Sequence, residues 1–404
     1  MQQDAQISGA QLLDSIDQTA MLAQVERWAA INSGTGNLAG LAALAGELAD
    51  AFSTLPGEVT LEEPAPVTAI APDGREVAKE HGRHMVLRVR PKAERRFLLT
   101  GHMDTVFPVD HAFQSLAWLD ADTLNGPGTA DMKGGLSVIL AALRAFEATA
   151  GAAKVGYDVM INSDEETGSL ASAPLISALA QGKYAALTYE PSALPDGTLA
   201  HARGGSGNYS VTVTGKSAHA GRNPQDGRNA VVAAARLAVA LKALDHAGLS
   251  VNPAKIDGGS ANNVVPDHAV LRFNIRPRST EAADGFQAAF AALLAELSSE
   301  LKVAFHVHGG ITRPPKPVDT RAQKLFDLVK ACGTELNQSL SWRDSGGVCD
   351  GNNIAACGVP VVDTMGVRGG SIHSPQEFMI VSSLRERAAL SALVLQRLSV
   401  GAPL

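Results

Sequence analysis

The sequence of 404 residues lacks the features that mark several large classes of protein. Its only cysteines, Cys332, Cys349 and Cys357, are odd in number and form no CxxC pair. This excludes a disulfide framework of paired cysteines and favours a reducing compartment. The sequence also has no run of basic residues, and its formal net charge is -7. Both properties argue against a protein that binds nucleic acid.

Targeting and membrane-spanning segments are missing from the sequence as it stands. Residues 1–18 carry acids and lack the basic and apolar regions of a signal peptide. The longest apolar helical segment, residues 230–244, is too short and too interrupted to span a bilayer. We therefore expect a soluble cytoplasmic protein with no membrane and no nucleic acid among its partners.

What the sequence does contain is enough apolar material for a large core. Hydrophobic residues make up 45% and charged residues 19%, which is ordinary for a globular protein. The length predicts two domains.

The first half of the chain alternates short apolar segments with alanine-rich helical ones. The apolar segments are nearly continuous, as in strands that are covered on both faces. The predicted strands are 84–89, 96–101, 157–163 and 184–190, and the predicted helices between them are 133–150 and 170–182. This alternation predicts an α/β fold, a mixed sheet with helices on both faces.

A different pattern begins after residue 205 and ends near residue 316. Its elements follow the order β-α-β-β-α-β, which is the ferredoxin-like arrangement of an antiparallel sheet with helices on one face. These elements are 208–215, 229–244, 252–259, 268–277, 283–300 and 302–310. The α/β pattern then resumes with a helix at 320–332, a strand at 359–365 and a helix at 381–399. We predict a catalytic domain, 1–205 and 317–404, and an inserted α+β lid or dimerisation domain, 206–316.

Acids and histidines recur at the carboxyl ends of the predicted strands, where open α/β sheets bind their ligands. Taken singly, such a histidine or pair of acids is more often structural. Together they would repel one another unless a cation neutralised them, and a mixed set of imidazoles and carboxylates suits zinc. The residues are His102, Asp104, Asp131, Glu165, Glu166, Glu190 and His373.

The charges in this set fit two metal ions. If Asp131 bridges two divalent ions, each ion gains one histidine and one glutamate of its own. Two zinc ions carry four positive charges, and Asp131, Glu166 and Glu190 with a bridging hydroxide carry four negative ones. Metal ions lower the pKa of bound water towards about 7, so the hydroxide is the natural nucleophile. Glu165, beside Glu166, is left to take the proton.

Five motifs follow one another in an order and at spacings that resemble the co-catalytic zinc peptidase family of aminoacylases, dipeptidases and glutamate carboxypeptidases. They are "GHMDTV", "GTADMKGG", "SDEETGS", "YEPS" and "IHSPQEF". Further segments resemble those of the bacterial glutamate carboxypeptidases in this family: "INSGTGN", "TGKSAHAG", "NVVP" and "SGGVCDGNN". The resemblance covers essentially the whole chain.

The resemblance implies a role for each matched residue. His102, Asp131 and Glu190 would bind one zinc ion, and Asp131, Glu166 and His373 the other, with Co²⁺ or Mn²⁺ as possible replacements. Asp104 would orient His102, as carboxylates behind a metal-bound histidine do. Glu165 would be the general base and then the acid that protonates the leaving amine. A cis peptide bond is implied after Asp131.

The resemblance also assigns residues of the insert. His219 would stabilise the oxyanion, often across a homodimer formed through the inserted domain. Asn263 and Arg276 would hold the substrate's carboxylate. If the resemblance is left aside, two interpretations of Arg276 are equally good: a ligand of the substrate's carboxylate, or a solvent-exposed arginine on a strand. His306 and His308 form an HxH pattern that we interpret as structural, because the ligand set is already complete.

The implied reaction is hydrolysis of the amide bond of an N-acyl amino acid or short peptide with a free C-terminal carboxylate. Glutamate at position 190 resembles the carboxypeptidases and N-deacylases of the family more than its aminopeptidases. The stretch 195–204 lacks the lysine of the glutamate-specific enzyme, and Arg313 is a loose match for a second basic contact. Two alternatives stay open: an N-carbamoyl or other non-peptide amidohydrolase, and a metal-free binding protein that kept the fold.

Overall fold

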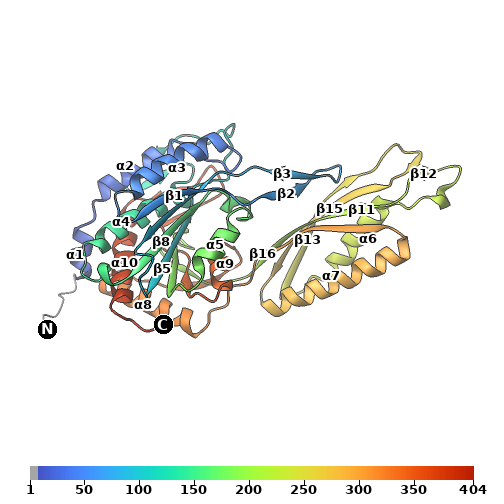
Figure 1. Ribbon diagram of the computed structural model, residues 1–404. Helices are drawn as coiled ribbons and strands as arrows, with labels where there is room; N and C mark the ends of the chain where they lie inside the picture. The colour runs from blue at the N-terminus through green and yellow to red at the C-terminus, as the bar shows by residue number, and fades with distance from the viewer. Residues whose placement is uncertain (1–7) are drawn as a thin grey trace.

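The computed structural model describes residues 8–404 and shows an elongated molecule made of a larger and a smaller body (Figure 1). The larger body holds a six-stranded mixed sheet, and the smaller one holds a four-stranded sheet. The predicted fold class, an α/β fold with an α+β insert, is confirmed.

The six-stranded sheet has the order β1-β4-β8-β5-β9-β18. β8, β5, β9 and β18 run parallel, whereas β1 and β4 are joined to the sheet by antiparallel pairing. The strands are β1 (Glu58–Glu62), β4 (His84–Val89), β5 (Arg96–His102), β8 (Gly156–Asn162), β9 (Ala185–Thr188) and β18 (Val361–Val362). Of the predicted strand 359–365, only Val361 and Val362 form β18. The chain beyond them stays bonded to the end of β9, where Met365 donates its N–H to the Thr188 carbonyl.

Helices cover both faces of this sheet, which explains the continuous apolar runs of its strands. Met85 and Leu87 of β4 point into the main core, whereas Val86 between them packs under α5 and α9. The helices of the main core are α2 (Gln18–Ala29), α3 (Leu38–Phe52), α4 (Gly134–Glu147), α8 (Thr320–Glu335) and α10 (Ser382–Ser399). Those of the opposite face are α5 (Ala173–Ala180) and α9 (Asp350–Ala356).

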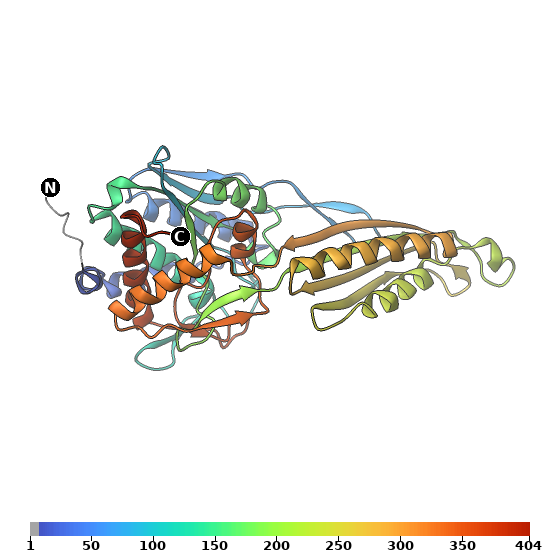
Figure 2. The same ribbon diagram turned by 90° about the horizontal axis from the view of Figure 1, so that it is seen from below.

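The four-stranded sheet is antiparallel and has the order β13-β15-β11-β16. Numbered along the chain, these strands lie in the order 2-3-1-4, with two helices packed on one face (Figure 2). Its elements are β11 (Ser206–Thr214), α6 (Ala230–Lys242), β13 (Leu249–Gly258), β15 (His268–Pro277), α7 (Thr280–Leu301) and β16 (Ala304–Arg313). Tyr209 stacks on Phe273 at 4.8 Å between ring centroids, inside a separate apolar core.

A hairpin from the larger body lies against the face of the smaller sheet that is opposite α6 and α7 (Figure 1). It consists of β2 (Val67–Ile70) and β3 (Glu76–Lys79), which sequence analysis did not predict. Arg272 donates to the Ile70 carbonyl at 2.8 Å, and Thr68 bonds to His308 Nε2 at 3.1 Å. This contact is consistent with the interpretation of His308 as a structural residue and not as a metal ligand.

Short strands complete the larger body near the cavity described below. The first set forms a small antiparallel sheet of β6 (Ala117–Trp118), β7 (Thr123–Asn125), β19 (Gly369–Gly370) and β20 (Phe378–Ile380). The second is a parallel pair of β10 (Leu199–Arg203) and β17 (Trp342–Ser345). Outside these sets the described residues form the helix α1 (Gly9–Asp14), the short strands β12 (Ala218–His219) and β14 (Val264–Val265), and four short helical turns. Between residues 8 and 404, we find no helix with the length and apolarity that crossing a bilayer requires.

Candidate metal centre and active site

Asp131 lies in the buried segment Thr129–Lys133, immediately before α4. The peptide bond between Asp131 and Met132 is cis, as the family resemblance implied. Gly135 allows the start of α4 to lie close to the residue that follows β9, since a Cβ at Gly135 would lie 2.2 Å from the Tyr189 carbonyl oxygen. The motif "TADMKGG" therefore places a carboxylate against the carboxyl end of the sheet.

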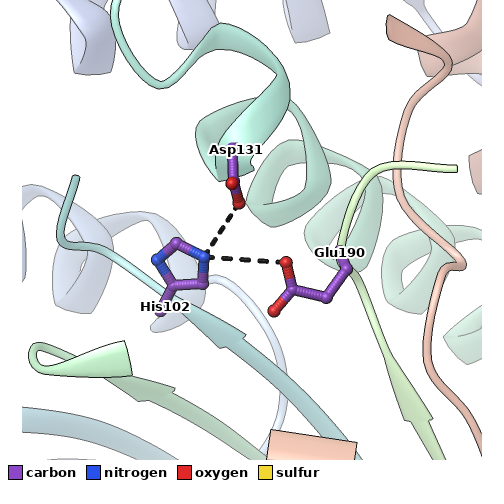
Figure 3. Close-up of side chains that lie close together, drawn as sticks. All are labelled: His102, Asp131 and Glu190. Atoms are coloured by element: carbon purple, nitrogen blue, oxygen red, sulfur yellow. Dashed lines mark hydrogen bonds and ion pairs between the residues drawn. The ribbon is translucent and has the colours of Figure 1, made fainter. Parts of the chain in front are cut away.

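Two groups of potential metal ligands share Asp131. In the first group, His102 Nε2 lies 3.0 Å from Asp131 Oδ1 and 3.8 Å from Glu190 Oε2 (Figure 3). In the second, His373 Nε2 lies 3.3 Å from Asp131 Oδ2 and 3.1 Å from Glu166 Oε2. Asp131 thus turns one oxygen to each group, as a ligand that bridges two cations would.

The members of these groups come from different parts of the fold. His102 ends β5, Glu190 follows β9, and Glu166 lies on a helical turn after β8. These three parallel strands end at the same edge of the sheet, so their carboxyl ends meet there. His373 reaches the site from a loop after β19, with a positive φ of 62°.

The electrostatics of the two groups favour a bound cation. Burial opposes the charged form of His102, but hydrogen bonds with nearby carboxylates outweigh burial and raise its pKa well above the usual value. Burial, followed by the charge of Asp131, raises the pKa of Glu166 to about 7. Without metal, protons must therefore compensate the gathered carboxylates. Divalent cations would replace these protons, and the donor set of imidazoles and carboxylates fits them.

Asp104 holds the segments on either side of the site together. His102 Nδ1 lies 3.0 Å from the backbone carbonyl of Asp104 and 3.4 Å from its carboxylate. The carboxylate itself accepts the N–H groups of Glu165 and Glu166, at 3.1 and 3.2 Å, and the Thr35 hydroxyl at 2.7 Å. Asp104 therefore fixes both the ring of His102 and the turn that carries the two glutamates.

Glu377 positions Asp131, a role that sequence analysis missed. Its buried carboxylate accepts N–H groups from Gly128 at 3.2 Å, Ala130 at 3.0 Å and Asp131 at 3.0 Å. Burial, followed by the negative charge of Asp131, raises the pKa of Glu377 to about 8, against the effect of the three donors. The only signal in the sequence was its place in "IHSPQEF", because the contact joins segments 246 residues apart.

Glu165 lies beside the metal groups and is held by Arg313. Arg313 Nη2 lies 2.7 Å from Glu165 Oε1 and 3.0 Å from the Glu165 carbonyl. The same guanidinium donates to Ser169 Oγ at 2.9 Å and to Asp350 Oδ1 at 3.0 Å. Arg313 was a loose match for a substrate contact, but its donors are engaged within the protein in this conformation.

A cavity of about 610 Å³ opens beside the two metal groups. Asp131, Glu165, Glu190 and His373 line one part of it. Other parts are lined by the segment after Glu190, by β10 and by β17 with the loop that follows it. The candidate base and ligands therefore face a space that accommodates a small substrate.

The residues predicted on the insert lie apart from this cavity within one chain. His219 is exposed on β12, which lies towards the far end of the smaller body (Figure 1). Asn263 is exposed and close to His219, because its carbonyl accepts the Ala220 N–H. Arg276 is exposed on β15, where its Nε donates to Asn274. None of the three lines the cavity, so their roles stay predictions.

Comparisons with known proteins cover both bodies. Residues 201–302 match the peptidase dimerisation domain family, and residues 84–190 match peptidase family M28. Carboxypeptidase G2 of Pseudomonas sp. (strain RS-16) is 28% identical over 391 residues, which are 95% of this chain and 91% of that protein. Succinyl-diaminopimelate desuccinylase 2 of Shewanella loihica is 29% identical over 299 residues, 69% of this chain and 78% of that protein.

Solved structures share the fold along the whole length. A tripeptidase from Staphylococcus aureus has a TM-score of 0.71 at 24% identity, over 96% of this chain and 100% of that one. An M20 family metallo-carboxypeptidase from Sulfolobus solfataricus has a TM-score of 0.70 at 15% identity, over 94% of this chain and 99% of that one.

The fold, the cavity and the two groups of potential metal ligands that share Asp131 together define a hydrolase of the metallopeptidase type. The chain shares its fold with peptidases of the M20 family, and residues 201–302 match the peptidase dimerisation domain family.

Proposed function

We propose that this protein hydrolyses the amide bond of an N-acyl amino acid or a short peptide with a free C-terminal carboxylate, and that it uses two zinc ions. The observation that carries the proposal is Asp131, which turns one oxygen to each of two groups containing a histidine and a glutamate. The named activities of relatives, a carboxypeptidase and a desuccinylase, support it, since both names describe hydrolysis of an amide.

The ligand chemistry supports zinc. One group offers His102, Asp131 and Glu190, and the other Asp131, Glu166 and His373. Sets of imidazole and carboxylate with room for substrate are typical of catalytic zinc, although Co²⁺ and Mn²⁺ accept the same donors. Bound there, the ions would polarise the substrate carbonyl and promote ionisation of water.

The protein groups around the metals would handle the protons. Glu165 takes a proton from the attacking water and later delivers it to the leaving amine. Its contact with Arg313 at 2.7 Å sets the direction of the carboxylate. The Asp104 carboxylate accepts the N–H groups of Glu165 and Glu166, and so holds the turn that carries both glutamates beside His102.

The insert would complete the site from a second chain. We propose that residues 206–316 form the inserted domain, that they join two chains in a homodimer, and that His219 donates to the oxyanion in the partner's site. The match to the dimerisation domain family and the exposure of His219 support this arrangement. Asn263 and Arg276 would hold the substrate's α-carboxylate.

The first test combines metal analysis with hydrolysis of N-acyl amino acids, dipeptides and N-carbamoyl amino acids, with and without a chelator. We expect two zinc ions per chain and chelator-sensitive release of an amino acid from N-acyl or peptide substrates. Hydrolysis of the carbamoyl substrates alone would favour the non-peptide amidohydrolase. A metal-free protein with no turnover would contradict the proposal and support a binding protein.

Glu165→Gln tests the general base. The amide keeps a hydrogen-bond acceptor for Arg313 but cannot take a proton, so kcat should fall about 100- to 10,000-fold while metal content is retained. Glu300→Gln serves as the matched control, because Glu300 is partly exposed on the insert and paired with Arg236. Wild-type turnover in Glu165→Gln would remove Glu165 from this role.

Mixed dimers test whether His219 acts across the dimer. A His219→Ala chain paired with a Glu165→Gln chain has one site with its own Glu165 and the partner's intact His219. We therefore expect such a heterodimer to recover about half of the wild-type activity, because one of two sites is complete. No recovery in a purified heterodimer would show that His219 does not act in trans.

A further inference from the structure

The cavity beside the metal groups extends to a second region lined by β10 and β17. These strands pair in parallel, with Leu199 opposite Trp342 and Ala200 opposite Arg343. Residues opposite each other in a pair project to the same face of a sheet. Ala200 and Arg343 both line the cavity, so this face is the one turned to a bound substrate.

The arginines in and beside the cavity differ in whether they are already paired. Arg203 forms two hydrogen bonds to the Asp363 carboxylate, at 2.7 and 3.2 Å, and a third to the Gly347 carbonyl. Arg313 is engaged by Glu165 and Asp350. Both guanidiniums therefore have their charge compensated by the protein.

Arg343 differs from Arg203 and Arg313 in lacking such a partner. Within residues 8–404, its guanidinium forms no ion pair and no hydrogen bond, and the residue is exposed. The neighbouring Asp344 also lines the cavity, but it forms no ion pair with Arg343. The Asp344 carboxylate accepts the Ala202 N–H at 3.2 Å and lies 3.4 Å from His201 Nδ1. Arg343 thus brings to the cavity, away from the metal ligands, a positive charge that forms no ion pair with the described part of the chain.

We propose that Arg343 determines specificity by selecting substrates that carry a second carboxylate. This inference rests on the proposed function, in which Asn263 and Arg276 take the α-carboxylate and leave Arg343 for another acid. A guanidinium binds a carboxylate through two parallel hydrogen bonds, and it discriminates against a neutral amide of the same shape. The second carboxylate belongs either to the side chain of the C-terminal residue or to the far end of the acyl group.

Two pairs of substrates distinguish these sources. N-acetylglutamate and N-acetylglutamine differ only in the side chain of the amino acid. N-succinylleucine and N-succinamoylleucine differ only at the end of the acyl group. For each pair, the ratio of kcat/KM for the acid to kcat/KM for the amide measures the selection, with the zinc-loaded full-length enzyme.

In the wild type we expect a ratio of about tenfold or more in one pair, since a hydrogen-bonded charge pair at a partly exposed site is worth about that factor. Arg343→Gln should bring this ratio close to one, chiefly by lowering kcat/KM for the acid. Arg343→Lys should retain part of the ratio, because the charge remains. Arg27→Gln, which removes a charge from α2 outside the cavity, should leave the ratio unchanged.

Three outcomes would overturn the inference. A wild-type ratio near one in both pairs, with the amides still hydrolysed, would reject Arg343 as the selector and leave the proposed function standing. A ratio that persists in Arg343→Gln would assign the selection to another group. Hydrolysis of none of the substrates by zinc-loaded enzyme would overturn the proposed function, and this inference with it.

Discussion

Replacing Glu377 by glutamine tests how the position of Asp131 is fixed. Glu377 Oε1 accepts the N–H groups of Ala130 and Asp131, and Oε2 accepts that of Gly128. Glutamine keeps one oxygen but turns an NH₂ group towards one of the buried donors. A hydrogen bond to a charged acceptor is lost and an N–H is left without a partner, which together cost about 2 to 3 kcal/mol.

The protonation of Glu377 decides whether this cost is seen. Its pKa is raised to about 8, first by burial and then by the charge of Asp131. Cations bound at Asp131 would remove the second cause, so in the metal-loaded protein Glu377 should be the ionised acceptor of all three N–H groups. If Glu377 were instead neutral, Glu377→Gln would be nearly isosteric and almost silent.

Zinc affinity and unfolding of the metal-loaded protein measure the effect of Glu377→Gln. We expect a decrease in zinc affinity of about 10- to 100-fold, as is usual when a group that orients a ligand is lost. The unfolding free energy should fall by the 2 to 3 kcal/mol estimated above for one lost charge-assisted bond. Glu300→Gln is the matched control. Unchanged affinity and an unchanged unfolding transition would refute the reasoning that Glu377 holds the Asp131 segment.

Two further predictions concern buried groups outside the metal site. Burial raises the pKa of Cys332 to about 12 and that of Cys349 well above its usual value, so mass spectrometry after alkylation of the folded protein should find label on Cys357 alone. Label on a second cysteine without denaturant would contradict this. Arg203→Met should lower stability by about 3 kcal/mol, because it leaves the buried Asp363 carboxylate with Lys316 alone at 3.3 Å. An unchanged urea midpoint would show that Asp363 does not depend on Arg203.

Local patterns in the sequence predicted five of the six strands of the larger sheet and the six main elements of the smaller body, but not α2, α3 or β1. β4 and β15 have the predicted limits, 84–89 and 268–277. Their signal is strong because a run or an alternation of apolar side chains is a property of adjacent residues. The hairpin of β2 and β3 was missed, since its short strands are partly exposed and gain their partners from the smaller body.

The candidate ligands were predictable because each ends or follows a parallel strand, or lies in a recognisable loop motif. Strand ends at one edge of a sheet must meet, so the chemistry of His102, Glu166 and Glu190 could be combined before any coordinates were known. The structure brings these side chains together, with Asp131 shared by the two groups, and their role as metal ligands stays a prediction.

The sequence by itself determined which side chains the protein could bring to its site and the order of the elements that carry them. Only the tertiary structure decided that Glu377 accepts the backbone N–H groups before α4, that Arg313 is occupied by Glu165, and that Arg343 has no ion pair or hydrogen bond within residues 8–404. The physical reason is distance along the chain. Contacts between segments far apart depend on how the sheet, the helices and the insert pack, and no periodicity of neighbouring residues encodes them.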